Sequence, residues 1–154
     1  MKVVLILDSL RSVENVGSIF RTAECLGVEE IVLCGTTPAP TDRFGRARKD
    51  LAKVSLGAEH LVPWVYAESV DDAVNLLRTR KYKIVALEQD PRAVSLDKFE
   101  KSENIALVIG NEVEGVAKSI LDTADEIIEI KMMGKKESLN VSVATGIALY
   151  ELLK

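Results

Sequence analysis

The chain has 154 residues, of which 47% are hydrophobic and 29% charged, and its formal net charge is -4. A chain of this length can bury one hydrophobic core, so we expect a single domain over residues 1–154. No apolar run approaches the roughly 20 residues of a membrane span, and the N-terminal run ends at Asp8 without a cleavage site, so a soluble, cytoplasmic protein is expected.

Cysteine and histidine are too few for a metal or disulfide framework. Cys25 and Cys34 lie among apolar residues without metal-ligand spacing, and His60 is the only histidine. We therefore expect no metal site, place both cysteines in the core, and assign His60 a structural or surface role.

Apolar and β-branched runs alternate with helical patterns along the chain. Strands are expected at residues 2–7, 30–34, 83–87, 105–109 and 126–130. The first helix is expected from Asn15 to Leu26, with Gly27 as its C-terminal cap, and a later helix is expected to begin after Ser69. This alternation predicts an α/β domain with a mainly parallel sheet and helices on both faces.

A basic run follows the second predicted strand and its proline-rich loop. Residues 43–53 contain five cations and one acidic residue, Asp50, with Phe44 among them. The cations are Arg43, Arg46, Arg48, Lys49 and Lys53. Alone, such a run is usually a solvated surface, and the negative net charge gives no overall signature of nucleic-acid binding.

Ligands of parallel sheets bind beyond the carboxyl ends of the strands, where three segments of this chain are unusual. In the first segment, the helix that follows the first predicted strand, Asn15, Ser18 and Arg21 share one face. An ordinary surface helix can also show this pattern. In the third, Ser138 and Asn140 occupy helix-capping positions before a helix of small residues over 141–153.

The second segment is GNEVEG, residues 110–115, which follows the most apolar predicted strand. Its glycines indicate a sharp turn or a close approach to a ligand. A phosphate-binding loop is rejected because the Lys-Ser/Thr pair is missing and Glu112 and Glu114 would repel phosphate. The G-x-G-x-x-G pattern is also absent, which argues against a nicotinamide or flavin cofactor.

Taken together, NVGSIFRTAECLGVEEIVLCG, IALVIGNEVEGV and IKMMGKKESLNVSVATGIALYE resemble the three motifs of the SpoU (TrmH-like) branch of the SPOUT RNA 2′-O-ribose methyltransferases. The resemblance implies a deep C-terminal trefoil knot, S-adenosyl-L-methionine (AdoMet) as methyl donor, no metal, and a ribose 2′-hydroxyl of tRNA or rRNA as acceptor. It also implies a homodimer, and the small-residue helix over 141–153 offers a close-packing face for it. The motifs do not separate tRNA from rRNA.

The resemblance assigns roles to individual residues. It implies catalytic roles for Arg21, Asn15, Glu112, Ser138 and Asn140. It implies cofactor contacts for Leu107, Ile109, Gly110, Asn111, Ile130, Met133, Ser138 and Leu139. The basic run becomes the candidate RNA-binding surface. One departure is Lys131, where many members carry proline.

Arg21 is the key group of the family. A guanidinium is too basic to accept a proton near neutral pH, so we expect Arg21 to hold an RNA phosphate and to stabilise the developing alkoxide, which leaves the proton acceptor open. Glu112 either pairs with Arg21 or fixes its own loop.

The alternative function is a noncatalytic RNA-binding or assembly protein on the same scaffold. Its mark would be the loss of Arg21 or of the stretch from Ser138 to Asn140, and both are present. The chain begins at its first predicted strand and ends at its last predicted helix. We therefore expect a catalytic domain without an N-terminal RNA-binding extension.

Overall fold

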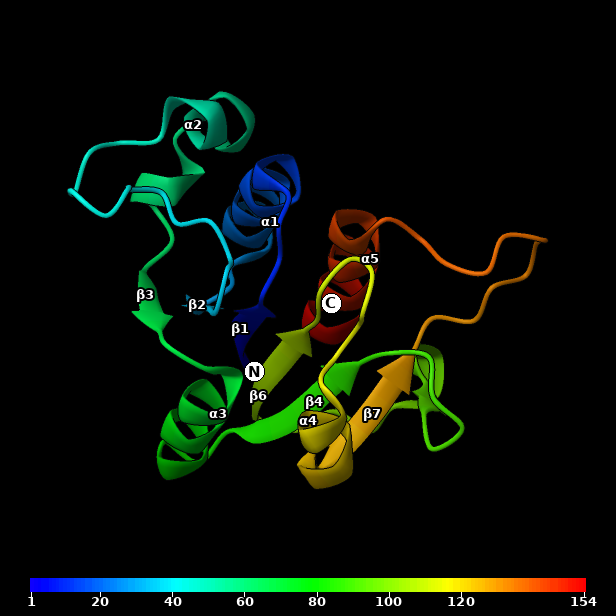
Figure 1. Cartoon of the computed structure of the whole chain (residues 1–154). Coiled ribbons are helices and arrows are strands. Elements are labelled where there is room, and N and C mark those ends of the chain that lie inside the picture. Colours follow the sequence, from blue (N-terminus) through cyan, green and yellow to red (C-terminus); the bar gives the residue numbers. More distant parts are fainter.

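The computed structural model describes residues 1–154 as strands that alternate with helices (Figure 1). The strands are β1 (Lys2–Asp8), β2 (Glu30–Cys34), β3 (Trp64–Ala67), β4 (Lys83–Leu87), β5 (Val94–Ser95), β6 (Asn104–Ile109) and β7 (Glu126–Glu129). The helices are α1 (Val13–Leu26), α2 (Lys49–Ser55), α3 (Val70–Thr79), α4 (Lys118–Thr123) and α5 (Val141–Leu153), with short 3-10 turns η1 (Ala58–His60) and η2 (Leu96–Lys98). None of the helices is both long and apolar enough to cross a membrane.

All strand pairs in the single sheet are parallel, and the strand order is β3-β2-β1-β6-β4-β7-β5. In the centre, Leu5 of β1 lies opposite Ile31 of β2 and Leu107 of β6. The predicted α/β fold with a mainly parallel sheet is confirmed, and the five predicted strands agree with the structure to within one residue at each end. The short strands β3 and β5, at the two edges of the sheet, were not predicted.

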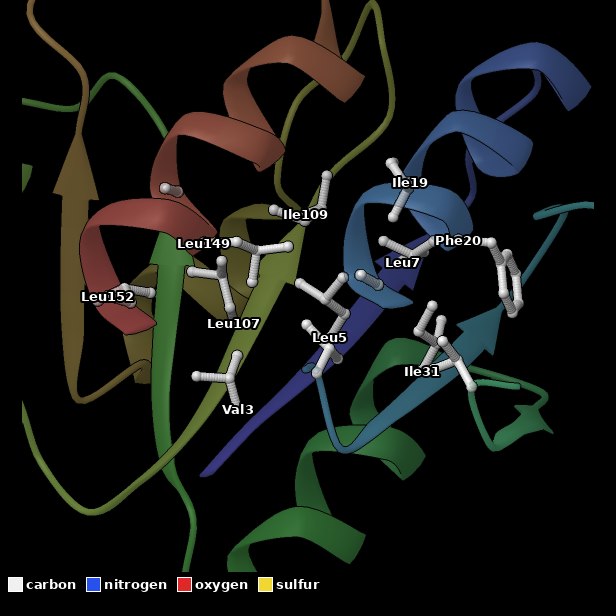
Figure 2. Close-up of a cluster of buried hydrophobic side chains, with 14 of the residues drawn as sticks. Val3, Leu5, Leu7, Ile19, Phe20, Ile31, Leu107, Ile109, Leu149 and Leu152 are labelled. Carbon is white, nitrogen blue, oxygen red and sulfur yellow. The ribbon is translucent and has the colours of Figure 1, made fainter. Parts of the chain in front are cut away.

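Helices cover both faces of the sheet, as predicted, and β1 serves both layers. Its alternate side chains Val3, Leu5 and Leu7 pack with α1, α2 and α5, whereas Val4 and Ile6 pack with α3 and α4. Figure 2 shows the first layer, where side chains of α1 and α5 meet those of β1, β2 and β6. Burying each such aliphatic or aromatic side chain stabilises the fold by roughly 1.5–3 kcal/mol. The two layers hold the carboxyl edge of the sheet in place.

The ends of α1 are defined by capping groups. The helix begins two residues before the predicted start, because the Ser12 side chain accepts a hydrogen bond from the Asn15 N–H at 3.1 Å. It ends at Gly27, as predicted, where a φ of 75° lets the glycine N–H reach the carbonyl oxygens of Ala23 and Glu24. Ser69 likewise caps α3 through the Asp72 N–H.

The two cysteines lie in different environments. Cys34 is buried in the core layer on the α3 and α4 side of the sheet. Burial raises the pKa of its thiol to about 12. Cys25 is exposed, so its predicted core position is wrong. The apolar stripe of α1 consists of Val16, Ile19, Phe20 and Ala23, and Cys25 falls outside it.

Candidate active site

The site lies at the carboxyl edge of the sheet, where the chain leaves β1, β4, β6 and β7 (Figure 1). The chain after β1 enters α1, the chain after β6 forms the loop over residues 110–117, and the chain after β7 forms the loop over residues 130–140 that enters α5. Because parallel strands end at one edge, the three unusual segments of the sequence meet there.

Glu112 fixes the start of α1. Its carboxylate accepts hydrogen bonds from the backbone N–H groups of Arg11 and Ser12, both at 3.1 Å, and from the side-chain amide of Asn15 at 3.3 Å. Partial burial acts to raise the pKa of Glu112, but these hydrogen bonds outweigh it and lower the pKa below its ordinary value. Glu112 makes no ion pair with Arg21, so it fixes its loop against α1.

Asn140 joins the third motif to the first. Its Nδ2 group donates to the Asn15 Oδ1 atom at 3.2 Å. Its own Oδ1 atom accepts from the Ser142 N–H at 2.9 Å, which makes Asn140 the N-terminal cap of α5, as predicted. A continuous path of hydrogen bonds therefore runs from Glu112 through Asn15 to Asn140.

The loop from Gly110 to Val116 turns tightly. A Cβ atom on Gly110 would overlap the backbone of Gly115 and Val116, so only glycine fits there. Asn111 holds the turn, because its Oδ1 atom accepts from the N–H of Val113 at 2.9 Å and its Nδ2 group donates to the Ser9 carbonyl at 2.7 Å. The sharp turn inferred from the glycines is present.

A cleft lies between this loop, the 130–140 loop and the end of β4. One arm encloses about 140 Å³ and another about 250 Å³. They share Leu87, Glu88, Ser138, Leu139 and Ala144, so they form one cleft. Taken together, the arms reach the roughly 300–1,000 Å³ of small-molecule sites.

Most of the residues predicted to contact a cofactor line this cleft. Ile130, Ser138 and Leu139 line one arm, and Ile109, Gly110 and Asn111 line the other. Met133 is 99% exposed and lies at an adjoining hollow of the 130–140 loop. Leu107 is fully buried in the core and lines neither arm, because it lies inside β6 and not at its end.

Arg21 stands apart from the hydrogen-bond path. It lies on α1 six residues after Asn15, exposed and without a hydrogen bond or ion pair. Ser138 is also exposed and makes no side-chain hydrogen bond. Both groups are therefore free to bind a ligand, whereas Asn15, Glu112 and Asn140 already hold one another.

Residues at the carboxyl ends of β4 and β7 also belong to the site and were not predicted from the sequence. Glu88 and Glu129 line the cleft, and the Glu88 carboxylate accepts the Val116 N–H at 2.8 Å. Gln89 donates through its side-chain amide to the Glu137 carbonyl at 2.8 Å and so holds the 130–140 loop. Their position was the available signal, because Glu88 and Gln89 directly follow β4 and Glu129 is the last residue of β7, and ligands bind at these carboxyl ends.

The basic run lies beside the start of α1. Lys49 and Lys53 share a hollow with Glu14 of α1. Arg46 and Arg48 pair with Asp42 and Asp50 at 3.0 and 2.9 Å. Arg43 and Arg46 both lie over the Phe44 ring, at 4.8 and 5.0 Å from its centre. Unlike Arg46 and Arg48, the exposed Arg43 has no carboxylate partner.

The fold and cleft define a class: parallel α/β proteins with a small-molecule cleft at the carboxyl edge of the sheet. The model of the SpoU rRNA Methylase family matches residues 2–150, and the chain belongs to this family. No group of three or more histidine, cysteine, aspartate or glutamate side chains is placed to hold a metal ion.

Relatives and solved structures of this family resemble the chain over almost its whole length. The 23S rRNA (guanosine-2′-O-)-methyltransferase RlmB of Bordetella pertussis is 31% identical over 98% of the chain, which spans 59% of that relative. An AdoMet-bound rRNA methyltransferase from Sinorhizobium meliloti superposes with a TM-score of 0.88 at 28% identity, over 98% of the chain and 55% of that protein. The A. aeolicus TrmH/SpoU tRNA modifying enzyme gives 0.83 at 28% identity, over 99% and 74%.

Proposed function

We propose that the chain is an AdoMet-dependent methyltransferase that acts on a ribose 2′-hydroxyl of tRNA or rRNA. The observation that carries the proposal is the path from Glu112 through Asn15 to Asn140, which draws the three family motifs together at one cleft. The free Arg21 follows Asn15 by six residues on the same helix. The names of the relatives, which include both rRNA and tRNA enzymes, support the substrate class without choosing between them. We also propose that the enzyme acts in the cytoplasm, where it would meet such RNA.

The cleft fits the chemistry of AdoMet. Leu87, Ile130 and Leu139 offer apolar contacts for an adenine ring, and Glu88 and Glu129 place carboxylates near a ligand that carries a sulfonium and an ammonium group. A Cβ atom on Gly110 would overlap the backbone of Gly115 and Val116 and so disturb the wall of this cleft. AdoMet, when bound, supplies a methyl group that is activated by the positive sulfur.

The residues of the chain position the acceptor and stabilise charge. Arg21 is free to bind the phosphate next to the target ribose and to stabilise the alkoxide that develops as the 2′-hydroxyl attacks. Asn15 has protein partners for both ends of its amide, so we assign it first a positioning role. Ser138, which lines the cleft without a hydrogen bond of its own, is the candidate to contact ribose or cofactor.

The basic run supports RNA as the substrate. The protein is acidic overall, and Arg43, Lys49 and Lys53 are cations without carboxylate partners within ion-pair distance. Lys49 and Lys53 lie beside the helix that carries Arg21. We propose that the whole run, with Arg46 and Arg48, contacts RNA phosphates.

We further propose a homodimer and the deep trefoil knot. The apolar side chains of Val143, Ile147 and Tyr150 on α5 are 50%, 42% and 63% exposed, which is unusual for one helix and favours a partner surface. The 130–140 loop and α5, which follow β7, contribute to the cleft as a knotted C-terminal segment would.

Methyl transfer from labelled AdoMet to unmodified RNA tests the proposal. After digestion to nucleosides, the label should appear as 2′-O-methylated nucleosides, and the Arg21→Ala protein should give little. Base-methylated nucleosides would contradict the ribose assignment. RNA binding without transfer would support the noncatalytic scaffold instead.

A further inference from the structure

The loop between β7 and α5 carries three exposed lysines, none of them in a salt bridge, although Lys131 shares a hollow with Asp97 and Glu129. Lys131, Lys135 and Lys136 form no ion pair, whereas Lys2, Lys83 and Lys154 elsewhere each pair with a glutamate. Glu137 is the only acidic residue between positions 130 and 140. The loop is therefore a local positive region on a protein with a net charge of -4.

This loop also forms one wall of the cleft. Ile130, Met132, Ser138 and Leu139 line it, so each lysine lies within three residues of the cleft wall. The hydrogen bond from Gln89 to the Glu137 carbonyl holds the loop near its C-terminal end. The lysines thus project from a segment that is anchored beside the site.

The lysines are far from the basic run at residues 43–53. In Figure 1 the 130–140 loop, coloured orange, extends away from β7, whereas the loop after β2, coloured cyan, lies beside α2 on the other side of α1 and α5. The strands β2 and β7 are four positions apart in the sheet, which separates their ends by roughly 19 Å. The two basic surfaces therefore flank the cleft.

An RNA strand that delivers a ribose to the cleft must continue on both sides of the target nucleotide. We propose that Lys131, Lys135 and Lys136 form a second RNA-backbone contact surface, which binds phosphates on the side of the cleft opposite the basic run. Lysine contacts phosphate as a point charge without reading the base. This inference rests on the proposed function, because it takes RNA as the substrate.

The test uses the Lys135→Ala, Lys136→Ala double variant, because Lys131 itself lines part of the hollow around the cleft. RNA affinity across a salt series should show a slope of log K against log salt that is smaller by about 1.4, as expected for two lost contacts to single-stranded RNA. The KM for RNA should rise severalfold, while kcat and AdoMet affinity stay unchanged. The matched control is the Lys81→Ala, Lys101→Ala double variant. These two exposed lysines precede β4 and β6, at the amino ends of the strands and away from the cleft.

Three outcomes would overturn the inference. An unchanged slope and KM would make the lysines ordinary solvated charge, and a loss of AdoMet affinity would mean that they shape the cleft. A changed mass in light scattering would make the loop a contact between protein copies. If the wild-type protein binds no AdoMet and methylates no RNA, the proposed function fails, and the salt series still decides whether the lysines contact RNA.

Discussion

Asn15 is placed by partners that are remote in sequence. Glu112 is 97 residues away and Asn140 is 125 residues away, yet both hydrogen-bond to its side chain. This network lies at the protein surface, and the loss of one member leaves the remaining donors and acceptors without their protein partners. Asn15, Glu112 and Asn140, one from each motif, therefore hold one another in place, and Arg21 makes no hydrogen bond to any of them.

Replacing Glu112 by Gln should destabilise the protein by about 1 kcal/mol. An amide would turn a donor toward the N–H groups of Arg11 and Ser12, and solvent screening keeps the effect small at this exposed position. Chemical denaturation measures the change. Glu114→Gln in the same loop is the control, because the Glu114 side chain makes no hydrogen bond or ion pair.

The effect of Glu112→Gln should depend on pH in a defined direction. Because the folded state lowers the pKa of Glu112, its stabilising contribution is complete above the ordinary value of 4.5 and is lost as pH falls through the folded-state pKa. The difference between wild type and variant should therefore shrink in acid. A difference that grows as pH falls would contradict the assigned hydrogen bonds.

Replacing Arg21 by Ala should lower turnover by roughly 10²–10³-fold, the usual effect of removing one group that stabilises developing charge. Stability and AdoMet affinity should change little, because the exposed Arg21 side chain makes no hydrogen bond or ion pair in the protein. Single-turnover kinetics and calorimetry measure these quantities. Arg21→Lys should recover only part of the rate, since lysine lacks the planar fork that binds phosphate. Lost AdoMet binding in folded Arg21→Ala protein would show that the role is misassigned.

At the scale of elements, the loop after β6 depends on one glycine. Gly110→Ala should destabilise the protein by roughly 1–3 kcal/mol and weaken AdoMet binding, because the new methyl group displaces the backbone of Gly115 and Val116. Gly134→Ala is the control, since a Cβ atom there meets nothing within 4 Å. Thermal unfolding and calorimetry compare the two variants, and equal behaviour would refute the close packing of this loop.

The exposed face of α5 carries the dimer proposal. Ile147→Glu should convert the dimer to a monomer in light scattering, because a charge buried in an apolar interface is costly. Leu76→Glu on α3 is the control, as its side chain is similarly exposed at 38%. Within the chain, α5 packs on α1 at an ordinary distance, since a Cβ atom on Gly146 would meet Thr22 at 3.5 Å. A wild-type monomer would refute the dimer.

The sequence predicts the buried elements better than the peripheral ones. Continuous apolar runs specify β1, β2, β4 and β6, because a parallel sheet covered on both faces requires them. The edge strand β3 has two exposed side chains, Val65 and Tyr66, and β5 has only two residues, so neither has a clear apolar pattern. The motifs indicated Asn15, Glu112 and Asn140, but their mutual contacts depend on tertiary structure that periodicity does not encode.

At the scale of the molecule, charge is distributed unevenly. An acidic protein binds an RNA polyanion only where cations gather, and the basic run beside α1 is one such place. Replacing Arg43 and Lys49 by Ala should lower the slope of log K against log salt for RNA by about 1.4–1.8 and leave AdoMet affinity unchanged. If the plots of log K against log salt coincide for wild type and variant, the run is only a solvated surface.

The central claim is that the chain methylates the 2′-oxygen of an RNA ribose. A methyl group at this oxygen blocks alkaline cleavage of the adjoining phosphodiester, so alkaline hydrolysis mapping reads the modification directly. Unmodified tRNA and rRNA incubated with the protein and AdoMet should gain a resistant position, which the Arg21→Ala protein should not produce. Transfer of the methyl group to RNA without any resistant position would contradict the account.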